Sequence, residues 1–186
     1  MRQQSLNIEI KKTRNGKHEA MLLVRPDGTN EWSPLHKGMV IHDLAHFVVE
    51  SYFSLNLGFY GEILSGTTME TMRSQAVTQV KEWSPDIFIA ETLAGSFQNA
   101  LMLGQDFKSF WGSFQENRSR SESLIRKRCR ELNSPWPAID ERTFREVCAR
   151  ITELWGIWEN LETGGTIYLK HLQASFTNRT PSRSTL

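Results

Sequence analysis

The sequence is poor in cysteine and contains no long apolar run. Its two cysteines, Cys129 and Cys148, form no Cys-x-x-Cys pair, which excludes a disulfide framework and a zinc site made of cysteines alone. No apolar stretch is long enough to span a bilayer. The first residues, Met1 to Ser5, lack the apolar core of a secretory signal. We therefore expect a cytoplasmic protein without a transmembrane segment.

An excess of charge of either sign is also missing. The 22 basic and 21 acidic residues leave a formal net charge of +1, so no global field would draw the chain to nucleic acid or to an anionic membrane. The most basic segment, residues 118–130, is more typical of a solvated helix face than of a phosphate-binding patch. No Gly-rich phosphate loop and no Gly-x-Ser-x-Gly elbow is present. Specific nucleic-acid binding is therefore not expected.

The hydrophobic pattern predicts an α+β fold dominated by helices. Alternating apolar residues predict strands at 6–10, 20–24 and 166–172, and a further short strand at 29–32. Apolar residues at helical spacing predict helices at 40–55, 67–83, 85–103, 107–114 and 139–161. We expect about five helices on a small antiparallel sheet that joins an N-terminal hairpin to a C-terminal strand. Residues 1–174 are expected to form one domain, and residues 175–186 a disordered tail.

The most informative feature is the run His42-Asp43-Leu44-Ala45-His46. Two imidazoles four residues apart lie on one face of a helix, and this arrangement suits a divalent metal, zinc above all. Glu50 and Asp43 fall on the same polar stripe, whereas the rest of the helical wheel is mostly apolar. A helix that is apolar nearly all round is buried. Its polar stripe must therefore face a cleft, a metal or buried partners.

A zinc ion at a working site usually has three protein ligands and a water molecule. Glu50 lies one turn beyond His46, so it can be a ligand, an outer carboxylate that orients the imidazole, or the partner of a nearby base. Asp43 can be a ligand, the catalytic base for a bound water, or a first-turn acid favoured by the helix dipole. His36 and His171 are weaker candidates, each more typical of an exposed or structural histidine.

Glu62 is the third carboxylate that the sequence offers for the site. The preceding loop contains Gly58 and Gly61, so it can turn sharply and bring the carboxylate back to the ion. Phe59 and Tyr60 would then line a pocket beside the metal. Glu62 and Glu50 therefore compete for the position of third ligand.

Two families of metal proteins share part of this pattern. The His-Glu-x-x-His zinc peptidases have the same histidine spacing, but Asp43 stands where they have Glu, and its shorter side chain disfavours a peptidase. The run from His42 to His46, followed by Gly61-Glu62, resembles the signature of the coenzyme Q biosynthesis protein four family, although the spacer before Glu62 is longer here. The resemblance implies a largely helical zinc protein that holds a prenylated quinone precursor for decarboxylation and hydroxylation. It also implies His42, Asp43, His46 and Glu62 as ligands.

These patterns favour a metal-binding protein, with zinc or another divalent ion on a buried helix. Its expected activity is that of a metal-dependent enzyme acting on a small or apolar ligand in a helical pocket. The alternative is a non-catalytic interaction protein whose His/Asp/Glu cluster is a buried polar network. An open metal position lined by aromatic residues would favour the enzyme, and a closed, fully hydrogen-bonded cluster would favour the alternative.

Overall fold

A single antiparallel sheet joins the two ends of the described chain. The computed structural model describes residues 4–13, 18–36, 38–72, 84–115 and 136–173. Its strands are β1 (Ser5–Lys11), β2 (His18–Val24), β3 (Asn30–His36) and β4 (Thr166–Leu172), in the order β3-β2-β1-β4. β4 pairs with β1 along its whole length, from Ser5 opposite Leu172 to Lys11 opposite Thr166. The predicted union of the N-terminal hairpin with the C-terminal strand is thus confirmed.

The sheet is buried on one face. Leu6, Ile8 and Ile10 of β1 are fully buried, and they alternate with polar residues, as expected for a strand with one face against a core. Ile10 lies opposite Met21 of β2 on one side and Ile167 of β4 on the other, so the apolar surface continues across the sheet. The helices pack against this surface.

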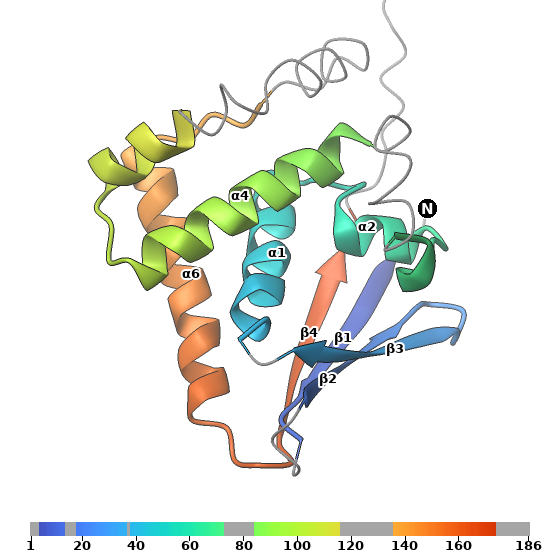
Figure 1. The fold of residues 1–186 in the computed structure, drawn as a ribbon. Helices are drawn as coiled ribbons and strands as arrows, with labels where there is room; N and C mark the ends of the chain where they lie inside the picture. Colours follow the sequence, from blue (N-terminus) through green and yellow to red (C-terminus); the bar gives the residue numbers. More distant parts are fainter. Residues whose placement is uncertain (1–3, 14–17, 37, 73–83, 116–135, 174–186) are drawn as a thin grey trace, which may run out of the picture.

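Helix α1 is the centre of the molecule. The helices labelled in Figure 1 are α1 (Val40–Phe53), α2 (Phe59–Leu64), α4 (Pro85–Met102) and α6 (Glu141–Glu159), and residues 69–72 and 107–115 are also helical. α1 contacts α2, α4, α6 and β4, and Figure 1 shows it between α6 and the strands with α4 crossing it. A helix with neighbours on several sides must be apolar nearly all round, which explains the composition of its sequence.

A cluster of phenylalanine rings packs between α4, residues 107–115 and α6. The Phe97 ring of α4 stacks on Phe110 with 4.9 Å between centroids, and Phe144 of α6 lies 4.6 Å from Phe110. Offset aromatic contacts of this kind add to the free energy gained from burial alone. These rings therefore join α4, residues 107–115 and α6.

The α+β class dominated by helices is confirmed, and the observed helix bounds lie close to the predicted ones. The strand predicted at 29–32 is longer, because β3 is an edge strand and tolerates the missing N–H of Pro34. The predicted helix at 67–83 is described only over 69–72. Thr67 and Thr68 precede the observed helical turn. Residues 73–83 of that prediction, the basic segment 118–130 and the predicted tail lie outside the described residues. Among those described, no helix is long and apolar enough to cross a membrane.

Candidate metal centre

His42, His46 and Glu91 form a group that could hold a metal ion. Each offers one ligand atom, and these atoms all lie within 4.8 Å of one another. Nε2 of His42 is 3.7 Å, and Nε2 of His46 is 3.5 Å, from Oε2 of Glu91. Ligands about 2.0–2.2 Å from a tetrahedral zinc ion are separated from one another by about 3.3–3.6 Å. The three side chains therefore need little movement to coordinate one ion.

The two imidazoles come from adjacent turns of α1, and the carboxylate comes from α4. The ring centroids of His42 and His46 are 4.7 Å apart, as the four-residue spacing requires. His46 is almost completely buried, whereas the Glu91 side chain is about half exposed, at 52%. The group thus has a buried side, on α1, and an open side, at Glu91.

Glu50 fixes the orientation of the His46 ring. Its Oε1 lies 3.1 Å from Nδ1 of His46. The same carboxylate accepts the backbone N–H of Phe59 at 3.0 Å on Oε1 and that of Tyr60 at 2.9 Å on Oε2. A carboxylate held by two amide donors acts as an acceptor, so Nδ1 of His46 donates the proton and Nε2 remains free for a metal. Glu50 is therefore an orienting partner of His46.

Two glycines allow the turn after α1 to approach that helix. A Cβ on Gly58 would lie 2.5 Å from Cδ of Glu50, and a Cβ on Gly61 would lie 2.0 Å from the backbone oxygen of Asn56. No side chain fits at either position without a shift of its neighbours. The close approach places the amides of Phe59 and Tyr60 on Glu50, so the sequence Gly58-Phe59-Tyr60-Gly61 supports the metal group indirectly.

Gln98 has the same relationship to His42 as Glu50 has to His46. Its Oε1 lies 2.9 Å from Nδ1 of His42, and its Nε2 donates to the sulfur of Met102 at 3.7 Å. This amide orientation assigns the Nδ1 proton to His42 and turns Nε2 toward Glu91. Both imidazoles thus present Nε2 to the same point in space.

Asp43 lies beside the group but is not one of its three members. Its backbone oxygen accepts a hydrogen bond from the Tyr60 hydroxyl at 3.1 Å. Its Oδ2 is buried and meets no hydrogen-bond donor among the described residues. Burial raises the pKa of the Asp43 carboxyl to about 6, although the charges of His46 and His42 act to lower it. A buried carboxylate oxygen without a hydrogen bond costs free energy. A ligand that donates a hydrogen bond to Asp43 would remove that cost.

The charges around His46 and Glu91 favour a cation at this group. Burial opposes protonation of His46, but its hydrogen bonds with Glu50 and Glu91 outweigh burial and raise its pKa to about 10. Burial likewise opposes ionisation of Glu91, yet its hydrogen bonds with His42 and His46 lower the pKa of this carboxyl. The same surroundings that favour a proton here also favour a metal ion, which competes with that proton.

The group forms one wall of a pocket of about 380 Å³. The polar wall consists of His36, His42, Asp43, His46 and Glu91. The apolar walls come from the sheet, the start of α1, α2 and the segment that follows it: Met21, Pro34, Leu35, Met39, Phe59 and Met69. The volume is at the small end of the usual range for ligand pockets, about 300–1,000 Å³.

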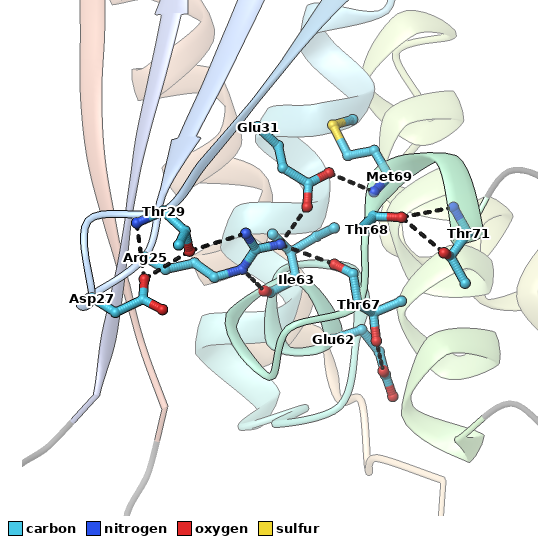
Figure 2. Close-up of polar contacts among 10 residues, drawn as sticks. All are labelled: Arg25, Asp27, Thr29, Glu31, Glu62, Ile63, Thr67, Thr68, Met69 and Thr71. Carbon is cyan, nitrogen blue, oxygen red and sulfur yellow. Dashed lines mark hydrogen bonds and ion pairs between the residues drawn. The ribbon is translucent and has the colours of Figure 1, made fainter.

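A polar network holds the sheet-side wall of this pocket (Figure 2). Arg25, which follows β2, donates from Nε to the oxygen of Ile63 at 2.6 Å and from Nη2 to the oxygen of Thr67 at 3.1 Å. Arg25 also pairs with Glu31 of β3, whose other oxygen accepts the amide N–H of Met69 at 2.7 Å. The network ties the β2–β3 hairpin to α2 and Met69, and thereby fixes the distance between two walls of the pocket.

The other candidate ligands lie outside the three-residue group. Glu62 is on α2, where its carboxylate accepts a hydrogen bond from the Thr67 hydroxyl at 2.9 Å (Figure 2), and it does not belong to the metal group. His36 lines the pocket but is not a member of the group either. His171 of β4 is buried in the core, and its ring lies 5.9 Å from that of Tyr60. Phe59 lines the pocket as expected, whereas Tyr60 is fully buried and is not among the lining residues.

Sequence reasoning missed Glu91 and Gln98. A signal was present, because these polar residues are seven positions apart and therefore lie on one face of a helix that is otherwise strongly apolar. Ile87, Ile89, Ala90, Leu93 and Ala94 of α4 are all buried. The pattern could have marked α4 as a second helix with a polar stripe, but it does not show that this stripe faces His42 and His46.

Known proteins give no independent indication of what this site does. Family models, curated proteins and solved structures were compared with the chain, and none of them matches. The function must therefore be argued from the geometry of the metal group, from the residues that orient it and from the pocket beside it.

Proposed function

We propose that the protein binds one divalent metal ion through Nε2 of His42, Nε2 of His46 and Oε2 of Glu91. The observation that carries this proposal is the convergence of three ligand atoms within 4.8 Å, two of them on oriented imidazoles. Zinc is the expected ion, because two histidines and one carboxylate are a common ligand set for zinc at sites with an open position. The same set also suits other first-row ions.

We propose further that the site is that of a metal-dependent enzyme acting on a small ligand. Three protein ligands leave at least one coordination position, and the group opens on a pocket of about 380 Å³. A divalent ion at such a position polarises a carbonyl oxygen or lowers the pKa of a bound water. Asp43 lines the same pocket, so its carboxylate can accept a proton from a group bound there.

The resemblance to the coenzyme Q biosynthesis protein four family stays a prediction. It names Glu62 and Asp43 as ligands beside His42 and His46, whereas the geometry favours Glu91. A small apolar pocket is compatible with an apolar substrate, but the quinone chemistry of that family rests on the short sequence resemblance alone.

The alternative is a structural polar network without a metal, and one observation favours it. Glu91 is within ion-pair distance of both histidines, and His46, Glu50 and two backbone amides already form a connected set of hydrogen bonds. The open pocket and the unsatisfied Oδ2 of Asp43 favour the metal site, because a closed network would satisfy its buried oxygens.

Elemental analysis of untagged protein, purified without chelator, tests the proposal directly. We expect close to one zinc or other divalent ion per chain, and we expect added zinc to restore this ratio after removal by a chelator. His46→Ala should abolish binding. Because that change leaves Glu50 buried without its partner, His42→Gln, on the more exposed imidazole, provides a second variant whose folding is checked by circular dichroism. Metal-free wild-type protein that also takes up no zinc would overturn the proposal in favour of the polar network.

A further inference from the structure

The polar side of the pocket beside the metal group is lined by histidines and carboxylates. Among the residues that the structure describes, the charged residues that line it besides the histidines are Asp43 and Glu91, and none is a lysine or an arginine. Carboxylates accept hydrogen bonds and repel anions. Apart from a bound metal ion, these carboxylates therefore present hydrogen-bond acceptors and negative charge to a ligand.

Asp43 is the group most in need of a ligand. Its Oδ2 meets no donor among the described residues, and Asp43 lines the same pocket as His42, His46 and Glu91. A ligand in this pocket that places one atom on a metal at the group can therefore also place a polar atom at Asp43. A donor N–H at that polar atom would satisfy the carboxylate.

The opposite walls are apolar and rich in sulfur. Met21, Met39 and Met69 line the pocket together with Phe59, and the amide of Met69 is anchored on Glu31 (Figure 2). Methionine sulfur makes favourable contacts with aromatic rings, and its flexible side chain adapts to their shape. The apolar part of the ligand is therefore best supplied by an aryl or arylalkyl group of modest size.

From this combination we infer that the pocket takes an uncharged aryl or arylalkyl carboxamide in preference to the corresponding carboxylate or phosphate. The amide oxygen is the atom for the metal, the amide N–H donates to Asp43, and the ring contacts the methionines. This inference rests on the proposed metal site and names its ligand class. The inferred preference is opposite to the usual one, because an anionic carboxylate is ordinarily a better ligand for a divalent ion than a neutral amide.

The test compares two molecules of almost the same shape, 3-phenylpropanamide and 3-phenylpropanoate, with the zinc-loaded full-length chain. Ligand-observed NMR is suitable, because it detects binding with dissociation constants of about 0.1–1 mM, which are ordinary for molecules of this size. We expect the amide to bind at least about tenfold more tightly than the carboxylate, because one N–H···carboxylate bond is gained and one charge repulsion is avoided.

Asp43→Asn should remove this preference or reverse it, because the new amide group can donate a hydrogen bond to a carboxylate. Asp86→Asn is the matched control. Asp86 is a partly buried carboxylate at the start of α4 that accepts the amide N–H of Leu57 at 3.0 Å and does not line the pocket. The Asp86→Asn variant should keep the wild-type preference for the amide over the carboxylate.

Metal content, measured on every sample, separates the two proposals. If wild-type protein takes up no metal, the proposed function itself fails. If it holds one ion per chain but binds the carboxylate as well as the amide, or binds neither, only the inferred ligand class is overturned. The inferred ligand class is also overturned if the Asp43→Asn variant retains its zinc and still prefers the amide.

Discussion

Glu50 lies one helical turn beyond His46 and binds Nδ1 of that residue at 3.1 Å, while both of its carboxylate oxygens accept backbone N–H groups from the start of α2. The metal group and the α1–α2 turn are therefore parts of one hydrogen-bonded unit. In the proposed metal site, the hydrogen bond to Glu50 would also make His46 a better ligand, because the carboxylate fixes its tautomer and raises its basicity.

Gly58→Ala should disturb this unit without touching a ligand, because its Cβ would lie 2.5 Å from Cδ of Glu50. We expect zinc affinity to fall by about tenfold, as is typical when a partner of a ligand is displaced. We also expect stability to fall by about 1–3 kcal/mol. Isothermal titration calorimetry and urea unfolding measure the two effects.

Gly95→Ala is the control for that change, because a Cβ there meets nothing within 4 Å. In the interior of α4 it should stabilise the protein slightly, by up to about 1 kcal/mol, and leave zinc binding as it was. Equal zinc affinities for Gly58→Ala and Gly95→Ala would show that Glu50 does not orient His46.

Three glutamine substitutions should rank the carboxylates. Glu91→Gln should weaken zinc binding most, by at least about 100-fold, because it removes an anionic ligand. Glu50→Gln should have a smaller effect, about 10-fold or more. Glu62→Gln should change affinity little, because that carboxylate binds Thr67. A larger loss for Glu62→Gln than for Glu91→Gln would instead support the ligand set implied by the family resemblance.

Replacement of His171 should stabilise the protein against acid. Neither ring nitrogen of His171 has a hydrogen-bond partner among the described residues, and burial lowers the pKa of this histidine from its ordinary value of 6.5, although the charge of Glu50 acts to raise it. Below about pH 6.5 the unfolded chain therefore binds a proton that the folded protein does not, so the free energy of unfolding falls as the pH drops toward the folded-state pKa.

His171→Leu removes this contribution together with two unsatisfied nitrogens. We expect it to stabilise the zinc-loaded protein by about 1–2 kcal/mol at pH 7.5, and we expect its advantage over wild type to be larger at about pH 5.5. Urea unfolding at the two pH values measures the difference. If wild type and variant lose stability in parallel between these pH values, His171 is not held neutral in the folded protein.

Lys12 should stabilise the end of α6. Its Nζ donates to the backbone oxygens of Trp158, Glu159 and Leu161 at 3.1–3.2 Å, where carbonyls lack helical partners and the helix dipole is negative. Lys12→Met should lower the free energy of unfolding by about 1–2 kcal/mol, as measured by urea unfolding. Lys11→Met, at an exposed position of β1, should change it by less than about 0.5 kcal/mol.

The sequence predicted the fold well wherever apolar residues repeat with the period of a strand or a helix. The alternation at Leu6, Ile8 and Ile10 indicated a strand with one buried face, and the apolar wheel of residues 40–55 indicated a buried helix, as α1 is. These patterns are local consequences of the geometry of strands and helices. The short turn after α1 carried no such period, and its continuation into the six-residue α2 was not predicted.

In the candidate site, too, local periodicity predicted some residues and tertiary packing decided the others. The spacing of His42 and His46 by itself determined that two imidazoles would share a helix face, because helical geometry fixes the relative position of residues four apart. No local rule determines which distant carboxylate meets them. Glu50, Glu62 and Glu91 were comparable by residue type, and only the crossing of α4 over α1 placed Glu91 beside both Nε2 atoms, with Gln98 on His42. That choice depends on how two helices pack, which the tertiary structure alone decides.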